Sequence, residues 1–120
     1  MKEEMTYQDR AAAYAKIIDH YGDVSQVKKA LEELGELIAA LSRFDNQIYR
    51  TSKTKTKLEA LDIEALDGAL MLMQVVEEIA DVTIMLEQLR LIFPINDDVK
   101  KVMKAKIERT LKRIKAEEMQ

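Results

Sequence analysis

Apolar residues recur every three or four positions along most of this chain, which is the period of an amphipathic α-helix. The first such stretch begins beside Thr6 and Asp9, whose spacing is that of a capping box at the start of a helix. We therefore expect a first helix from this point to about Tyr21. Gly22 follows it and can end the helix in a left-handed conformation.

A second helix is expected to start at Asp23 or Ser25, either of which can cap it, and to run to about Phe44. The pattern then stops at residues 45–57, DNQIYRTSKTKTK, which are polar and have no period, so we interpret them as a flexible loop. The apolar positions of the second helix are spaced by threes and fours, as on one helix face. They are Val27, Ala30, Leu31, Leu34, Ile38 and Leu41.

A long apolar segment follows from Leu58 or Asp62, and Pro94 is expected to stop it. Because apolar residues cover much of the circumference of this third helix, we expect it to be mostly buried. Asn96 or Asp97 is then placed to cap a last helix. The apolar face of that last helix is formed by Val99, Met103, Ile107, Leu111 and Ile114.

The length of 120 residues fits a single all-α domain, residues 1–120, because no stretch alternates as a strand does. With only 3 Gly and 1 Pro, a turn-rich β-sandwich or barrel is not expected. Hydrophobic residues make up 48% and charged residues 34%, which is too charged for a membrane protein and too apolar for a disordered one. A helical core of this size is thin, so we expect oligomerisation to bury more surface.

The composition also limits the chemistry. The absence of Cys excludes a disulfide scaffold, a thiolate zinc site and a cysteine nucleophile, and a single histidine, His20, excludes a multi-histidine metal site within one chain. The formal charge of −3 gives no overall signal for binding a polyanion. No apolar run approaches the roughly 20 residues that span a bilayer, and the first residues lack the apolar core of a secretion signal. We therefore expect a cytoplasmic protein without a membrane partner.

Two acidic strings do not fit a simple helical bundle. EELGEL in the second helix and EEIADV in the third each place two carboxylates three residues apart, hence on one helix face. Like charges at this spacing repel, so these carboxylate pairs do not stabilise the helices. The strings supply Glu32, Glu33, Glu36, Glu77, Glu78 and Asp81.

Carboxylates at the edge of a buried apolar face need a positive partner, or they take up protons. No Lys or Arg lies one turn away in the third helix, and a divalent cation held by both helices would meet the need. All-oxygen ligands select Mg²⁺ or Mn²⁺ over zinc or copper. The alternative reading is that these residues are simply the solvated faces of an acidic bundle.

EELGEL followed by EEIADV resembles the paired Glu-x-x-Glu and Glu-x-x-Asp motifs of the MazG-like nucleotide pyrophosphohydrolases, in the all-α NTP pyrophosphatase superfamily. The resemblance extends over most of the chain, from HYGDVSQVKKALEELGELIAAL to the helix with KIERTLKRI. It implies a four-helix bundle completed by oligomerisation, as a homodimer or homotetramer. It also implies Mg²⁺-dependent cleavage of a nucleoside triphosphate to the monophosphate and pyrophosphate, which clears unwanted nucleotides from the pool.

By motif position, the resemblance makes Glu33, Glu36, Glu78 and Asp81 the metal ligands. Glu32 and Glu77, which precede them, are the candidate catalytic residues, to orient water or a second metal. A Glu that is not bound to metal can accept the proton of the water. One departure from the family is the spacing, because 41 residues lie between Glu36 and Glu78, more than is usual.

Substrate contacts are expected from basic and polar groups near the two acidic strings and in the last helix. Lys106 and Arg109 match basic positions of the family's last helix, and Lys29 lies one turn before Glu33. Gln26 can read a base edge, and His20 either stacks on a base or is simply a helix C-terminal residue. A competing hypothesis is a non-catalytic interaction module that binds a partner or nucleic acid through the basic last helix and the Lys-rich loop. The acidic total charge argues against nucleic acid.

Overall fold

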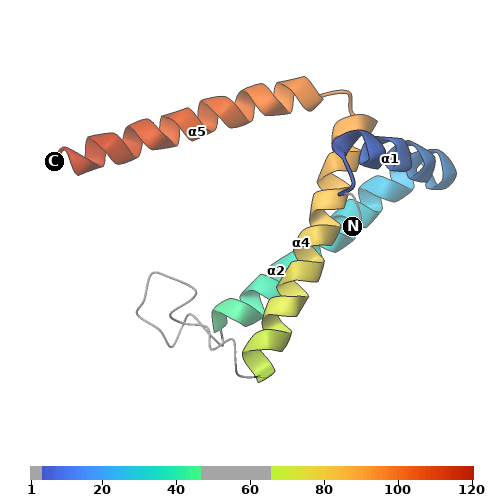
Figure 1. Cartoon of the computed structure of the whole chain (residues 1–120), viewed down its shortest axis with the longest axis horizontal. Coiled ribbons are helices and arrows are strands. Elements are labelled where there is room, and N and C mark those ends of the chain that lie inside the picture. Colours follow the sequence, from blue (N-terminus) through green and yellow to red (C-terminus); the bar gives the residue numbers. More distant parts are fainter. Residues whose placement is uncertain (1–3, 47–65) are drawn as a thin grey trace. The chain divides into compact units, whose positions relative to one another are not determined.

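The structure is a computed structural model that describes residues 4–46 and 66–120. Within these residues the chain is entirely helical: four helices and no strands (Figure 1). The all-α prediction is therefore confirmed for the described residues. The chain divides into two compact units, residues 1–88 and 89–120, and the expected single domain over all 120 residues stays a prediction. The helices are α1 (Tyr7–Tyr21), α2 (Asp23–Phe44), α4 (Leu66–Ile92) and α5 (Asn96–Glu118).

The start of α1 is the capping box that its sequence predicts. The Thr6 hydroxyl accepts from the backbone N–H of Asp9 at 3.1 Å, and the Asp9 carboxylate accepts from the backbone N–H of Thr6 at 3.0 Å. These two bonds satisfy donors that have no partner inside the helix. The helix ends at Tyr21, as expected, and Gly22 has a positive φ of 92°. Its ψ of 152° lies outside the left-handed helical region, so the turn is one that Gly permits and other residues rarely adopt.

The predicted caps of α2 and α5 are wrong. Gly22 is the N-cap of α2 and Ile95 that of α5, and neither makes a side-chain capping bond. Asp23 and Asn96 are instead the first helical residues, because the carbonyls of Gly22 and Ile95 already accept the first helical hydrogen bonds. Asp97 and Asp98 do lie in the first turn of α5, where a negative charge favours the helix dipole.

The other helix boundaries agree with the sequence where they can be compared. The second helix ends at Phe44, although Asp45 still has helical backbone angles, so the predicted loop does not begin there. Residues 47–57 of that loop, and the expected starts of the third helix at Leu58 or Asp62, lie outside the described residues. The third helix ends at Ile92, just before Pro94, as predicted.

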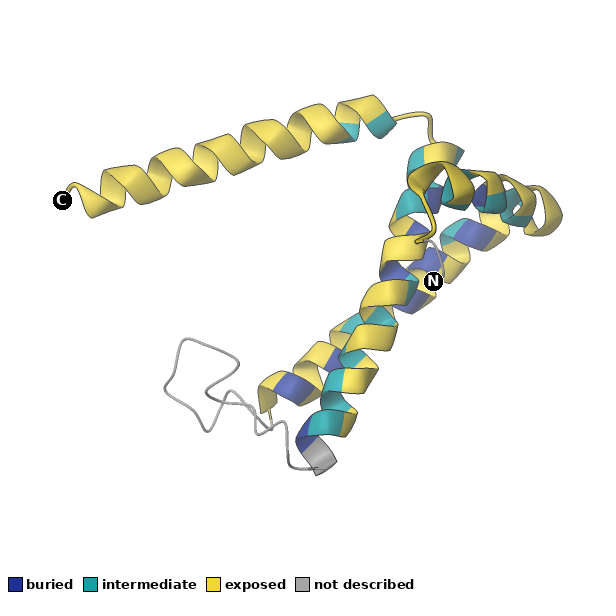
Figure 2. Cartoon of the chain, viewed as in Figure 1, coloured by how far each residue is buried: buried dark blue, intermediate teal, exposed yellow. Residues whose placement is uncertain are grey.

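The core of the first unit lies where α2 and α4 run side by side, with α1 across one end (Figures 1 and 2). Among the described residues it is small, and glutamine and glutamate side chains are buried within it beside the apolar ones. A core of this size leaves little apolar burial to hold the helices together. Its buried apolar residues are Tyr14, Ala30, Ala40, Phe44, Val82 and Met85, and its buried polar residues are Gln26, Glu33 and Gln88.

Polar bonds join α1 to α4. The Arg10 guanidinium donates to both oxygens of Glu87, at 2.9 and 3.0 Å, and the Tyr14 hydroxyl donates to the same carboxylate at 2.6 Å. A bidentate bond between a guanidinium and a carboxylate fixes direction as well as distance. These bonds therefore set the position of α1 relative to the end of the candidate site described below.

The third helix is not mostly buried, contrary to the prediction. Val76 is 60% exposed and Ile79 is 50% exposed in α4, and Leu31 and Ile38 in α2 are about two-thirds exposed. The reason is that α2 and α4 cover each other on one side only, so their outer faces have no neighbour among the described residues of the first unit (Figure 2).

The second unit consists of the end of α4, a short turn and α5. None of the residues of α5 is buried, and its apolar face, including Met103, Ile107 and Leu111, is about half exposed. Turn bonds from the Phe93 N–H to the Leu89 carbonyl and from the Val99 N–H to the Ile95 carbonyl lead into the helix. Across the described residues, no helix has the length and apolar character required to cross a membrane.

Candidate metal centre and adjoining cavity

The two acidic strings meet in space. Glu33 and Glu36 from α2 face Glu78 and Asp81 from α4, and one carboxylate oxygen of each lies within 4.8 Å of the corresponding oxygens of the other three. The i, i+3 spacing puts each pair on one helix face, and the packing of α2 against α4 brings the two faces together. The structure therefore joins the four residues that the sequence proposed as metal ligands.

Part of this carboxylate group is withdrawn from water. Glu33 is buried, and its Oε2 atom and that of Glu78 have no hydrogen-bond partner. Burial, together with the charges of Glu36 and Asp81, raises the pKa of Glu33 above its ordinary value of 4.5. Buried polar atoms without a partner are rare in folded proteins, and a bound ion or an ordered water would satisfy these two oxygens.

One positive group already contacts the cluster. The Lys29 Nζ lies 3.5 Å from Oε1 of Glu33, one helical turn away on α2. Within the described part of the chain it is the one cation at ion-pair distance from the four carboxylates. A single ammonium cannot balance four carboxylates, so the group keeps excess negative charge or holds protons.

The donor set fits a hard divalent cation. All four candidate ligands are carboxylate oxygens, which suit Mg²⁺ or Mn²⁺ and not the softer metals that prefer nitrogen and sulfur. Mg²⁺ bound by a few carboxylates keeps waters in its remaining positions, and a phosphate oxygen can replace those waters. Glu36 is exposed, so one side of the cluster is open to solvent and to such a ligand.

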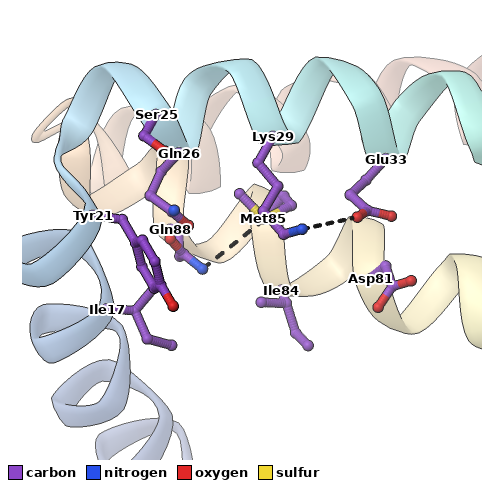
Figure 3. Close-up of a pocket in the computed structure, with 10 residues that line it drawn as sticks. All are labelled: Ile17, Tyr21, Ser25, Gln26, Lys29, Glu33, Asp81, Ile84, Met85 and Gln88. Atoms are coloured by element: carbon purple, nitrogen blue, oxygen red, sulfur yellow. Dashed lines mark hydrogen bonds and ion pairs between the residues drawn. The ribbon is translucent and has the colours of Figure 1, made fainter.

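A cavity of about 460 Å³ opens beside the cluster, with Glu33 and Asp81 in its wall (Figure 3). This volume is in the range of pockets that hold small molecules. Lys29 lies between the carboxylates and the far end, where Tyr21, Gln26 and Gln88 come together (Figure 3). The cavity therefore has an acidic end and an uncharged end lined by amide and aromatic side chains. Its remaining lining residues are Ile17, Ser25, Ile84 and Met85.

Gln88 is the functional candidate that sequence reasoning missed. It is 2% exposed, its Nε2 lies 4.0 Å from the Met85 sulfur, and its Oε1 has no hydrogen-bond partner. A buried amide acceptor without a donor is ready to bind one from a ligand in the cavity. The available signal was its spacing, since Gln88 follows Asp81 by seven residues, which is two helical turns along the same face.

The predicted substrate residues divide between those that line the cavity and those that do not. Gln26 is buried in its wall, and Lys29 also lines it. His20 is exposed and lies edge-on to the ring of Tyr21, with the ring centroids 4.6 Å apart. Tyr21, not His20, therefore presents its ring to the cavity.

The two predicted catalytic glutamates are outside the four-carboxylate group. Glu32 and Glu77 are both exposed. Glu32 lines a shallow second depression that shares Tyr21, Ser25 and Lys29 with the cavity. Of the two, Glu32 is therefore the one that the described contacts place beside the cavity.

Lys106 and Arg109 lie on α5 in the second unit, and both are exposed. Neither forms an ion pair with a described residue, whereas their neighbour Lys104 lies 3.9 Å from Glu108. Their proposed role toward phosphate stays a prediction.

Comparisons of this chain with protein families, with curated proteins and with solved structures found no match.

Proposed function

We propose that this protein is a Mg²⁺-dependent nucleoside triphosphate pyrophosphohydrolase of the MazG-like kind. It would convert a nucleoside or deoxynucleoside triphosphate into the monophosphate and pyrophosphate, as a nucleotide-pool housecleaning enzyme. The observation that carries the proposal is the meeting of four carboxylates from α2 and α4 beside a cavity of about 460 Å³. The resemblance of EELGEL and EEIADV to the family motifs supports the same reading.

The acidic end of the site would bind the phosphates through the metal. Glu33, Glu36, Glu78 and Asp81 hold the ion, and the open side of the cluster admits the phosphates. When bound, Mg²⁺ or Mn²⁺ supplies neutralisation of phosphate charge and a water of lowered pKa. Glu32, at the edge of the site, is placed to accept a proton from water, and Glu77 is the second candidate.

The uncharged end of the cavity would bind the base and sugar. Gln26 and Gln88 carry both donors and acceptors, which suits the edge of a base, and Tyr21 offers a ring for stacking. Lys29 lies where the phosphates would pass from one end to the other. Lys106 and Arg109 of α5 are further candidates for contact with the phosphate chain, on the resemblance of the last helix alone.

Assembly into a homodimer or homotetramer is part of the same proposal. The exposed Leu31 and Ile38 are seven residues apart on α2, and Val76 and Ile79 extend the apolar surface on α4. Two copies of the α2–α4 pair, packed through these faces, would make a four-helix bundle. Light scattering on a size-exclusion column tests this: wild type should elute as an oligomer and Leu31→Glu as a monomer.

The direct test of activity is a panel of all NTPs and dNTPs with Mg²⁺, assayed for pyrophosphate, on wild type and on Glu36→Gln. We expect turnover on at least one nucleotide and its loss in Glu36→Gln, which removes an exposed ligand without disturbing the core. Absence of turnover on every canonical and modified nucleotide would count against the enzyme.

One observation favours a second candidate, a non-catalytic binding module. Between Lys100 and Lys115, α5 carries eight basic residues and one acid, Glu108, and all of them are exposed. A basic amphipathic helix of this kind can bind an acidic partner or nucleic acid. Salt-sensitive binding that persists in Glu78→Ala, together with no nucleotide turnover, would select this candidate over the enzyme.

A further inference from the structure

We propose that Lys29 is a built-in counter-ion of the four-carboxylate group, that a divalent cation displaces it, and that the released ammonium then binds a phosphate of the substrate. This inference rests on the proposed function, because it needs a metal at the cluster. On this inference Lys29 has two successive partners: a carboxylate when the metal is absent, and a phosphate when the metal is bound.

The two side chains of the Lys29–Glu33 ion pair differ in their exposure to solvent. The side chain of Lys29 is 55% exposed, whereas that of Glu33 is 11% exposed. The carboxylate is therefore held by the packing of α2 against α4, while the ammonium sits on a flexible stem that reaches in from solvent. Of the two groups, the ammonium is the one that can leave without opening the core.

A cation that takes Glu33 as a ligand competes with this ammonium. The distance of 3.5 Å between Lys29 Nζ and Glu33 Oε1 means that both positive groups would act on one carboxylate. The unpartnered oxygens of Glu33 and Glu78 offer the metal a place, and its charge then repels the ammonium. Binding of the metal thus breaks the Lys29–Glu33 ion pair. The affinity for the metal is therefore lower than it would be if the four carboxylates had no counter-ion.

The displaced ammonium stays near the substrate. Lys29 lines the cavity between its acidic end and its amide-lined end (Figure 3). A lysine ammonium is a common point-charge ligand for phosphate. The exchange would therefore bring a positive charge to the substrate at the step when the metal has occupied the carboxylates.

A simple surface ion pair is the competing explanation, since an i, i+4 pair of Lys and Glu is worth little and is common on helices. Lys28 provides the matched control. It is the adjacent residue on α2, it is exposed, and its replacement by Met changes the net charge in the same way. Any effect of overall charge on cation binding appears equally in both variants.

The experiment is a calorimetric Mg²⁺ titration of wild type, Lys29→Met and Lys28→Met at low ionic strength, with melting curves in a chelator. We expect Lys29→Met to bind Mg²⁺ about three- to tenfold more tightly, a range set by partial screening of an exposed ammonium. Lys28→Met should change the affinity by less than about twofold. In the chelator, Lys29→Met should melt below Lys28→Met, because its carboxylates have lost their counter-ion.

The second half of the proposal is measured with a non-hydrolysable triphosphate analogue at saturating Mg²⁺. Lys29→Met should bind the analogue several-fold more weakly than wild type, and Lys28→Met should not. Equal or weaker Mg²⁺ binding by Lys29→Met overturns the displacement, and unchanged analogue binding overturns the phosphate contact. If wild type and both variants bind no Mg²⁺, the proposed function itself fails. If wild type and Lys29→Met bind Mg²⁺ with the same affinity, only the displacement of Lys29 fails.

Discussion

The hydroxyl of Tyr14 on α1 donates a 2.6 Å hydrogen bond to the carboxylate of Glu87 on α4. Arg10 donates a hydrogen bond to each oxygen of the same carboxylate. Glu87 directly precedes Gln88 of the cavity, and α1 contributes Ile17 and Tyr21 to the cavity wall. The bond therefore fixes the wall of the candidate site as well as joining two helices. Substitutions at Tyr14 should affect both stability and ligand binding.

Tyr14→Phe removes only the hydroxyl. We expect it to lower the free energy of unfolding by roughly 1.5–3 kcal/mol, the range for a hydrogen bond to a charged group. Chemical denaturation measures this change. Tyr7→Phe, on the exposed side of α1, is the control and should stay within about 0.5 kcal/mol of wild type. A loss in Tyr7→Phe as large as that in Tyr14→Phe would mean that the bond to Glu87 contributes nothing specific.

Alkaline pH should weaken the same contact. Burial and the hydrogen bond to Glu87 raise the pKa of Tyr14 from 10.0 to about 12. The protonated phenol is thus favoured in the folded state, so its contribution is complete below pH 10 and is lost as the pH rises to about 12. Unfolding curves across this window should show a steeper loss of stability in wild type than in Tyr14→Phe. Identical slopes in the two proteins would contradict the assignment.

Glu33→Gln should stabilise the metal-free protein at neutral pH, because it removes a buried charge that repels Glu36 and Asp81. The raised pKa of Glu33 means that protonation favours the fold: the stabilising contribution is complete below pH 4.5 and is lost as the pH rises through the folded pKa. In a chelator, the melting temperature of wild type should therefore rise as the pH falls from neutral. Glu33→Gln should melt a few degrees higher at neutral pH and show a flatter dependence.

The control for this prediction is the metal itself. Added Mg²⁺ should raise the melting temperature of wild type at neutral pH and have little effect on Glu33→Gln, because a ligand has been lost. A Glu33→Gln protein that melts below wild type in the chelator would show that the carboxylate is not under charge repulsion.

Gln88→Met replaces the buried amide by an apolar side chain of the same length. Because the Gln88 Oε1 atom has no partner, we expect the ligand-free protein to gain roughly 1 kcal/mol of stability. Binding of a non-hydrolysable nucleoside triphosphate should weaken by about tenfold. Gln74→Met, on the exposed surface of α4, is the matched control and should bind the nucleotide as wild type does. If Gln88→Met also binds it normally, the amide does not recognise the ligand.

The sequence predicted those features that depend on neighbouring residues or on helical spacing. The Thr6–Asp9 capping box is local, because both residues that form it lie within four consecutive positions of the sequence. The meeting of EELGEL and EEIADV followed from two apolar helices, each with a carboxylate pair at the edge of its apolar face. Where spacing alone sets a face, the structure agrees with the prediction.

Other features depend on contacts between distant segments, and no local pattern carries them. Arg10 and Glu87 are 77 residues apart, and the sequence around each residue does not predict a contact with the other. Gln88 was overlooked because a single helical amide has no special meaning in the sequence until a cavity is seen beside it. The exposed face of α4 was expected to be buried, because an apolar helix surface indicates that it packs against something but does not show which segment packs there.

The central claim is that the carboxylates of α2 and α4 jointly bind a divalent cation, and a Mn²⁺ titration followed by the EPR signal of the free ion tests it most directly. Wild type should deplete the free signal, and Asp81→Asn, which removes one of the two α4 ligands, should weaken binding at least about tenfold. Asp19→Asn, an exposed carboxylate on α1 outside the cluster, should bind as wild type does. A free Mn²⁺ signal that wild type leaves unchanged, or that Asp81→Asn depletes as fully as wild type, would contradict the account.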